Sequence, residues 1–225
     1  MAGKIPRTSH QPVVTFHPAT SDRWDDLASL FGPKGATAGC WCMFWRQTQA
    51  EFTRGHGEAN RRALEQLAAS SRPPGILAYA GAAAVGWCAV APRSEYTRLG
   101  RSRVLKPLDA EPVWSIVCFF VARTFRRKGL TVQLLRAAVA FARSHGARIV
   151  EGYPVEPAQG SIPDVFAYTG LASAFRRAGF KEVARRSPTR PFMRCVLGPG
   201  KAVRPAAQST RSKGQPVRRT RAVRP

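Results

Sequence analysis

A strand, a basic turn with one glycine and a long helix follow one another between Val113 and Gly146, and this order constrains the fold most. Residues 113–121 read VWSIVCFFV, an apolar run rich in valine and aromatic residues that suits a strand buried on both faces. From Gly129 onward, apolar residues recur in a helical stripe: Leu134, Leu135, Ala138, Val139 and Ala142. Gly146 is a helix stop, and residues 148–155 (RIVEGYPV) then predict a second strand. A strand–helix–strand crossover makes the two strands parallel.

The turn between the first strand and the helix has the composition of an anion-binding site. Its sequence is ARTFRRKGLT, and Arg126, Arg127 and Lys128 concentrate positive charge there. The first N–H groups of a helix lack intrahelical partners, and the helix dipole favours negative charge at the same end. Gly129 allows the backbone to approach a ligand closely. The segment therefore predicts a turn that can hold a phosphate.

At these residues the chain resembles the GNAT N-acetyltransferase family. Val121 ends the hydrophobic strand that precedes the acyl-CoA loop in the family, and the loop pattern is Arg/Gln-x-x-Gly-x-Gly/Ala. The corresponding residues here are Arg126, Arg127, Lys128, Gly129, Leu130 and Thr131. The match departs at Thr131, where the family has Gly or Ala. Its hydroxyl group could donate to a phosphate, or its bulk could weaken binding.

The resemblance implies an α/β (α+β) acyl-CoA N-acyltransferase fold. Its mixed, mostly antiparallel sheet has a central parallel strand pair that splays, and helices cover both faces. Residues 75–80 and 84–93 predict the hairpin before the acyl-CoA strand, with a turn at Gly81-Ala82. Residues 169–186 resemble the last helix, followed by Gly-Phe and a strand, and residues 191–197 the final strand. The expected order is helix, helix, hairpin, acyl-CoA strand, long helix, strand, helix and two closing strands.

Three segments are predicted from composition. Residues 12–197 form a single domain, long enough for a substantial core, after a flexible N-terminus over residues 1–11. Residues 198–225 hold eight Lys/Arg and no acidic residue, and they predict a disordered basic tail. Without those eight, 28 of the 36 basic residues remain against 13 acidic ones, so the domain itself is basic. The tail favours nonspecific contact with polyanions, while a specific nucleic-acid role is the alternative.

The chain has the features of a cytoplasmic protein that does not enter a membrane. No run of 18 or more apolar residues exists, and the N-terminus lacks the apolar region of a secretory signal. The five cysteines are odd in number and scattered, which favours free thiols in a reducing compartment. Cys40-x-Cys42 lacks a second Cys/His pair at fitting spacing, so no metal site is predicted.

The amino-terminal third is expected to shape the acceptor site. Two helices are predicted, over residues 21–32 and 60–70, and in the resembled fold the first two helices border the acceptor pocket. The segment GCWCMFWRQ, residues 39–47, lies between them. Its candidate pocket residues are Trp41, Phe44, Trp45 and Arg46. The alternative is that these side chains are core packing for a loop.

The resemblance implies direct transfer, in which an amine attacks the acetyl thioester of acetyl-CoA. The backbone of Phe119, Phe120 and Val121 would line the acyl and pantetheine arm. Glu151 is the candidate base that removes the proton of the amine, with Glu156, Glu95 and Glu111 as other candidates.

The resemblance implies that a tyrosine of the last helix protonates the leaving thiolate. Phe175 stands at that position here, and it has no proton to donate. Tyr168, Ser173, Tyr153 or water could substitute. The predicted function is transfer of an acetyl group to a primary amine of an unidentified small molecule or protein. The alternative is a non-catalytic protein on the same scaffold that binds acyl-CoA or nucleic acid. The oligomeric state is left open.

Overall fold

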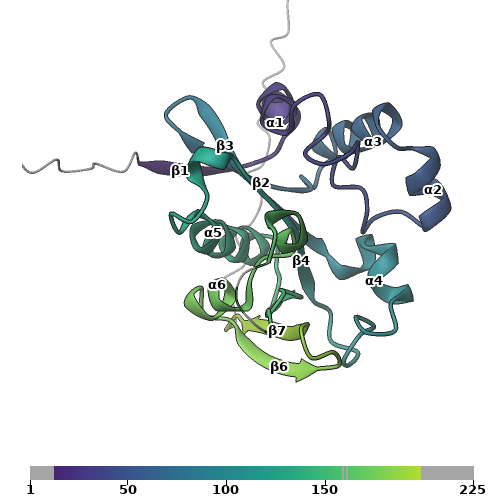
Figure 1. Ribbon diagram of the computed structural model, residues 1–225, viewed down its shortest axis with the longest axis vertical. Helices are drawn as coiled ribbons and strands as arrows, with labels where there is room; N and C mark the ends of the chain where they lie inside the picture. Colours follow the sequence, from purple (N-terminus) through teal and green to yellow (C-terminus); the bar gives the residue numbers. More distant parts are fainter. Residues whose placement is uncertain (1–12, 159, 161, 199–225) are drawn as a thin grey trace, which may run out of the picture.

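The computed structural model describes residues 13–158, 160 and 162–198 (Figure 1). Within them, seven strands form one sheet in the order β1-β2-β3-β4-β5-β7-β6. All neighbours are antiparallel except β4 and β5, which confirms the predicted mixed sheet with a central parallel pair. The strands are β1 (Val14–Pro18), β2 (Gly75–Ala80), β3 (Ala83–Pro92), β4 (Trp114–Val121), β5 (Ile149–Gly152), β6 (Lys181–Arg185) and β7 (Pro191–Val196).

Helices cover both faces of the sheet, as predicted (Figure 1). One core packs α1, α3 and α4 on Trp87 and Val117, and the other packs α5 and α6 on Val90 and Ile116. The α-helices are α1 (Trp24–Phe31), α2 (Gln49–Arg54), α3 (Glu58–Ala68), α4 (Thr97–Arg101), α5 (Leu130–Ser144) and α6 (Ala172–Arg177). Short 3-10 turns are η1 (Ser21–Arg23), η2 (Arg93–Glu95), η3 (Arg123–Phe125) and η4 (Asp164–Ala167).

The predicted elements differ from the structure mainly at their ends. The hairpin, the long helix and the closing strands lie where the sequence predicts them, whereas β1, α2 and α4 were not predicted. The second parallel strand ends at Gly152 rather than continuing to Val155, because the chain there turns away from β4. The predicted N-terminal segment and residues 199–225 of the basic tail lie outside the described residues.

Helix α5 has the sequence features that a long packed helix needs. Its apolar stripe is buried, with Leu134, Leu135 and Ala138 fully covered by the sheet and by α6. Gly129 precedes the helix with φ of +81°, and Gly146 follows it with φ of +84°. Glycine adopts this left-handed conformation without steric cost, so the chain can turn at both ends of α5 without strain.

A β-bulge in β4 separates the strand pair at the centre of the sheet. Ala89 and Val90 of β3 are consecutive, yet their partners are Cys118 and Ile116, so Val117 is an extra residue in β4. A bulge bends its strand and redirects the backbone groups beyond it. Strands β4 and β5 are paired only from Trp114 to Ile116, and beyond the bulge they diverge. This opening, which we call the splay, is where the site is assembled.

Candidate functional site

The splay is filled from within by the segment that leads into α6. The Phe119 N–H of β4 donates to the Tyr168 carbonyl over 2.6 Å, and Val155 pairs with Leu171 in an isolated parallel bridge. Gly170 has φ of +83°, and a Cβ built on it would lie 3.0 Å from the Phe119 ring. The segment therefore takes the place of a continued β5 and satisfies the backbone of β4.

Beyond the splay, the loop from Val121 to Gly129 presents a row of backbone N–H groups. The N–H groups of residues 127–131 have no acceptor among the described residues. Arg127 and Gly129 both lie in the left-handed region, with φ of +59° and +81°. The Arg126 Nε donates to the Val121 carbonyl over 2.9 Å and thereby ties the loop to the end of β4. Consecutive free N–H groups at the start of a helix, here one of 15 residues, are an arrangement that can bind an anion.

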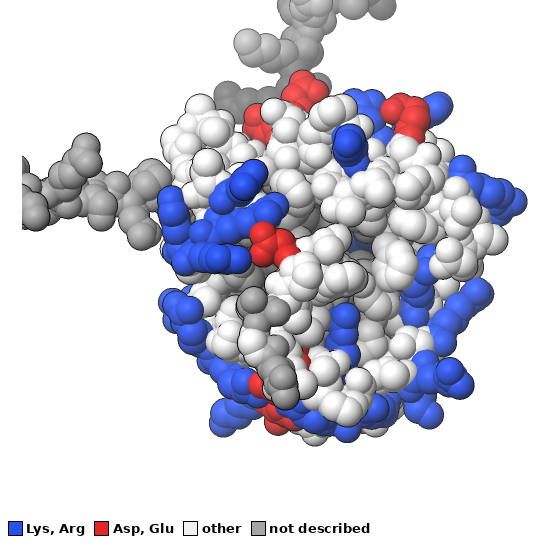
Figure 2. Space-filling model, viewed as in Figure 1, with Lys and Arg blue, Asp and Glu red and all other residues white. Residues whose placement is uncertain are grey.

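Basic side chains surround this loop. In Figure 2 a group of Lys and Arg side chains covers the surface over α5. Besides the predicted Arg126, Arg127 and Lys128, the structure adds Arg177 of α6, whose Nη2 would lie 4.0 Å from a Cβ at Gly129. One carboxylate enters the group, because Asp164 of η4 pairs with Arg126 over 2.9 Å. The loop thus combines free backbone donors with positive charge.

The predicted acyl-arm residues lie on both faces of β4. The Phe119 ring packs edge-on against Phe175 in the core beneath α6, at 6.2 Å between centroids. The Phe120 ring is on the opposite face, against Phe31 of α1. The Val121 carbonyl is engaged by Arg126. Phe175 itself is fully buried, so it serves the core where the family pattern has a proton donor.

Glu151, the predicted base, is held in a buried hydrogen-bond network. Its side chain is 1% exposed, and its Oε1 accepts from Arg93 Nη1 at 3.2 Å and from the Tyr153 hydroxyl at 2.6 Å. Its Oε2 accepts from Arg194 Nε at 2.6 Å, and Arg194 also pairs with Asp109. Both carboxylate oxygens are therefore already occupied by donors, two of which are guanidinium groups. This geometry favours a structural role, and the role as base stays a prediction.

The other predicted carboxylates and acids are placed as follows. Glu156 pairs with Arg176 and Arg185, and Glu95 pairs with Arg46 and Arg72.

Of the candidate acids, Ser173 is exposed on α6. Tyr168 lies at the splay, where burial raises the pKa of its hydroxyl while the charges of Arg190 and Arg98 act against that rise. A phenol already keeps its proton at neutral pH, and a raised pKa makes it a weaker acid.

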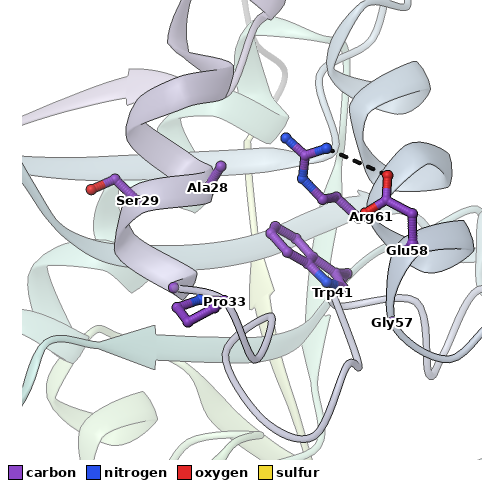
Figure 3. A pocket seen from close by; sticks show the side chains of 8 residues that line it. Ala28, Ser29, Pro33, Trp41, Gly57, Glu58 and Arg61 are labelled. Carbon is purple, nitrogen blue, oxygen red and sulfur yellow. Dashed lines mark ion pairs between the residues drawn. The ribbon is translucent and has the colours of Figure 1, made fainter.

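The four predicted acceptor-pocket residues do not form one wall. Trp41 is buried and stacks on Trp24 at 5.9 Å between centroids. It lines a pocket of about 590 Å³ between α1 and α3, where the Arg61 guanidinium lies beside its ring (Figure 3). Phe44 and Trp45 instead pack against each other, on the side of the molecule where α2 and α4 lie. The Arg46 guanidinium lies on the same side, over the Tyr96 ring.

Four of the five free thiols lie close enough to influence one another, a grouping that their spacing does not reveal: Cys40, Cys42, Cys88 and Cys118. The pKa of Cys42 is lowered by a hydrogen bond with Cys118, and then by one from the Trp87 Nε1, 3.0 Å from its Sγ. Burial, followed by the neighbouring Cys42, raises the pKa of Cys40 from its ordinary value near 9 to about 11. Among the described residues, no cluster of three or more Cys, His, Asp or Glu side chains is arranged for a metal ion.

The raised pKa predicts slow alkylation of Cys40. Only the thiolate reacts, and at pH 8 a thiol with a pKa near 11 is ionised in about one molecule in a thousand. Iodoacetamide labelling of Cys40, followed by peptide mapping, is therefore expected to accelerate about tenfold per pH unit between pH 8 and 10. Labelling of the native protein at pH 8 as fast as that of the urea-unfolded chain would contradict this environment.

Besides the arginine partners of Glu151, sequence reasoning missed four charged residues near the splay and the loop. Asp164, Arg177 and Arg190 come from segments after β5, and Arg98 comes from the short helix α4. None of them carries a local pattern, because each reaches the site through a contact distant in sequence. Only the surplus of arginine over acidic residues in the chain gave a general indication of them.

In the part of the chain that the structure describes, each helix is too short or too polar to cross a bilayer.

Comparison with known proteins gives one family match. The model of the acetyltransferase (GNAT) family matches residues 41–162, more than half of the chain, and this range includes β4, the basic loop and α5. No curated protein matches the chain in sequence.

Solved structures match the fold over most of the chain. A GNAT-family acetyltransferase from Listeria monocytogenes 4b F2365 is 13% identical, with a TM-score of 0.50, and the match covers 82% of this chain and 95% of that one. The aminoglycoside N-acetyltransferase AAC(6')-Iy in complex with CoA is 17% identical over 80% and 95% of the two chains, with a TM-score of 0.49. The aminoglycoside acetyltransferase AAC(6')-Ib, in complex with coenzyme A and kanamycin, is 18% identical over 82% and 95%, with a TM-score of 0.47. At such identities the likeness concerns the fold alone.

Proposed function

Because this chain belongs to the acetyltransferase (GNAT) family, we propose that it transfers an acetyl group from acetyl-CoA to the primary amine of an acceptor. The amine attacks the thioester carbon directly while both substrates are bound. The bond from carbon to sulfur breaks, the CoA thiolate leaves with a proton, and the amine loses one.

The observation that carries this proposal is the loop before α5. Five consecutive backbone N–H groups without an acceptor among the described residues precede or begin a 15-residue helix. Arg126, Arg127 and Lys128 lie on the same loop. These groups fit the pyrophosphate of CoA, which needs many donors and positive charge. The hydroxyl of Thr131, in the first turn of α5, is proposed to add a further donor.

With the pyrophosphate at the loop, the acyl end of the cosubstrate is proposed to extend back along β4 into the splay. The Phe119 N–H points toward that opening, where it now donates to the Tyr168 carbonyl. It is therefore the proposed donor for a substrate carbonyl oxygen. The thioester carbonyl would replace Tyr168 at this N–H. A donor aimed at an oxygen that gains charge during attack stabilises the transition state.

Tyr168 is proposed as the general acid that protonates the leaving thiolate. Its carbonyl lies at the splay, and its partly buried hydroxyl, like any phenol, carries a proton at neutral pH that it can give to a thiolate formed beside it. Replacing Tyr168 with phenylalanine keeps the backbone carbonyl and the ring but removes the proton. We expect kcat to fall about 100-fold, with acetyl-CoA affinity changed less than about twofold. Unchanged kcat would assign the proton transfer to Ser173 or to water.

The proposed function is tested by the release of CoA thiol from acetyl-CoA in the presence of a panel of amines. Direct attack predicts initial-rate lines that intersect when both substrates are varied, and no acetyl group covalently attached to the protein by mass spectrometry. Parallel lines and an acetylated cysteine would instead indicate a covalent intermediate. Acetyl-CoA binding without release for any amine would favour the alternative of a non-catalytic acyl-CoA-binding protein. Contact of the basic tail with polyanions stays a prediction.

A further inference from the structure

Buried polar atoms without partners are concentrated on the face of the sheet that α1, α3 and α4 cover. Among the described residues, seven buried side-chain atoms have no hydrogen-bond partner, and five of them belong to two short segments. These five are Trp45 Nε1, Arg46 Nη2, Gln47 Oε1, Tyr96 OH and Arg98 Nη2. Native proteins rarely leave such atoms unsatisfied, so this concentration indicates a missing partner.

The two segments, residues 45–47 and 96–98, are in direct contact. The Arg98 N–H donates to the Trp45 carbonyl over 3.1 Å, and the Arg46 guanidinium lies 4.8 Å from the centre of the Tyr96 ring. Four of the five unpartnered atoms are donors, and only Gln47 Oε1 is an acceptor. A partner for this surface must therefore be rich in acceptors.

Both guanidinium groups are held rigidly and each keeps one nitrogen free. The Arg46 side chain is 7% exposed, and its Nη1 pairs with Glu95 over 2.7 Å. Arg98 donates from Nη1 to Gln49 Oε1 over 2.7 Å and lies 4.0 Å from the centre of the Phe44 ring. Side chains fixed in this way lose little freedom when a ligand binds.

The local charge is positive and incompletely neutralised. Among the described residues, Arg98 has no carboxylate within 4.0 Å, and Glu95 is shared between Arg46 and Arg72. Removal from water lowers the pKa of the Arg98 guanidinium, so its charge is unfavourable there without a partner. An anion at this place would relieve that cost.

Arg98 relates the unpartnered atoms to the splay. The charge of Arg98 acts on the Tyr168 hydroxyl, and the Tyr168 carbonyl marks the position proposed for the thioester. The segments also belong to the face covered by α1, α3 and α4, opposite α5 and its loop. A molecule bound at Arg98 would therefore lie on the face of the sheet away from α5 and its loop.

We propose that Arg98 and Arg46 bind a carboxylate carried by the acceptor, so that the acceptor is a small amino acid rather than a polycationic amine. This inference rests on the proposed function. The planar guanidinium fork matches a carboxylate, and the Trp45 Nε1 and the Tyr96 hydroxyl supply further donors. Gln47 Oε1 is left to accept from an N–H of the acceptor.

The test compares amines in matched pairs. Each proteinogenic amino acid is compared with its α-carboxamide, and O-phosphoethanolamine with ethanolamine, by the release of CoA thiol. We expect kcat/KM to be at least tenfold higher for one or more amino acids than for their amides. The variants are Arg98→Gln, Arg98→Lys and a control, Arg101→Gln, which removes the same charge from an exposed position of the same helix.

Arg98→Gln is expected to raise KM for the amino acid at least tenfold without affecting the amide. Arg98→Lys keeps the charge without the fork and should give a smaller loss, whereas Arg101→Gln should stay within twofold. A preference for uncharged amines or polyamines that Arg98→Gln leaves unchanged would overturn the inference and leave the proposed function intact. Acceptance of O-phosphoethanolamine alone would replace the carboxylate with a phosphate and would also overturn it.

A readout without turnover separates this inference from the proposed function. The unfolding temperature is measured with each amino acid and each amide at constant ionic strength, with and without CoA. A rise with the amino acid that Arg98→Gln abolishes would support the carboxylate site even if no acetyl-CoA bound. No rise with any amino acid, together with no release of thiol, would overturn both.

Discussion

Replacing Gly129 with tryptophan is expected to lower acetyl-CoA affinity at least 100-fold, or about 3 kcal/mol of binding free energy. Gly129 lies in the left-handed region at the start of α5, where its N–H belongs to the row of free donors. A side chain there would occupy the space in which the pyrophosphate must approach the backbone. It would also face the Arg177 guanidinium, which lies near that position.

The control for this variant is Gly146→Trp at the other end of the same helix. Gly146 has φ of +84°, against +81° for Gly129, and nothing lies within 4 Å of a Cβ built on it. Both variants therefore carry the same backbone strain, and only one obstructs the loop. Isothermal titration with acetyl-CoA and thermal unfolding are measured for both. Equal affinities of the two variants would remove the loop from the proposed site.

Replacing Glu151 with alanine is expected to destabilise the protein by about 3–5 kcal/mol. The carboxylate is 1% exposed and joins Arg93, Arg194 and Tyr153, so its removal leaves two guanidinium groups without their buried partner. Urea unfolding of the full chain measures the loss. Glu156→Ala is the control, because Glu156 also pairs with two arginines but at the surface, where the cost should stay below about 1 kcal/mol.

Glu151→Gln then separates the structural role from the proposed role as base. The amide keeps the shape and one acceptor oxygen but cannot take a proton. If Glu151 is the base, kcat falls about 100-fold or more while acetyl-CoA still binds. A fall in stability with kcat preserved in the folded fraction would assign Glu151 to the scaffold and leave the proton to water.

The elements predicted from sequence are those with strong local patterns. The continuous apolar run of β4, the stripe of α5 and the glycine turn of the β2–β3 hairpin were all recognisable. Strand β1 was missed because its sequence, VTFHP, is only five residues long and ends in proline, so its alternation is too short to stand out. Helix α2 has no buried residue, and α4 buries only Leu99, so neither carries an apolar stripe that could predict it.

The site was predictable only where it is built from one continuous segment. The loop from Arg126 to Thr131 could be recognised because a phosphate site at a helix start needs its glycine and its basic residues side by side. The two arginine partners of Glu151 and the position of the Arg98 guanidinium depend on contacts between residues more than 40 positions apart. No spacing in the sequence records such contacts, and Trp41 and Trp45, four residues apart, point to different parts of the molecule for the same reason.

The hydrogen bond between Phe119 and Tyr168 has a consequence for the solubility of the protein. Where β4 leaves β5, the sheet has an internal edge, and an uncovered strand edge can pair with another chain. Tyr168 and the bridge between Val155 and Leu171 cover that edge with the protein's own backbone. If the segment around Tyr168 detaches from β4 and no ligand replaces it, the edge of β4, which is rich in valine and aromatic residues, becomes exposed. The ligand-free protein should therefore aggregate sooner on heating than the protein with CoA bound, even where the two unfold at similar temperatures.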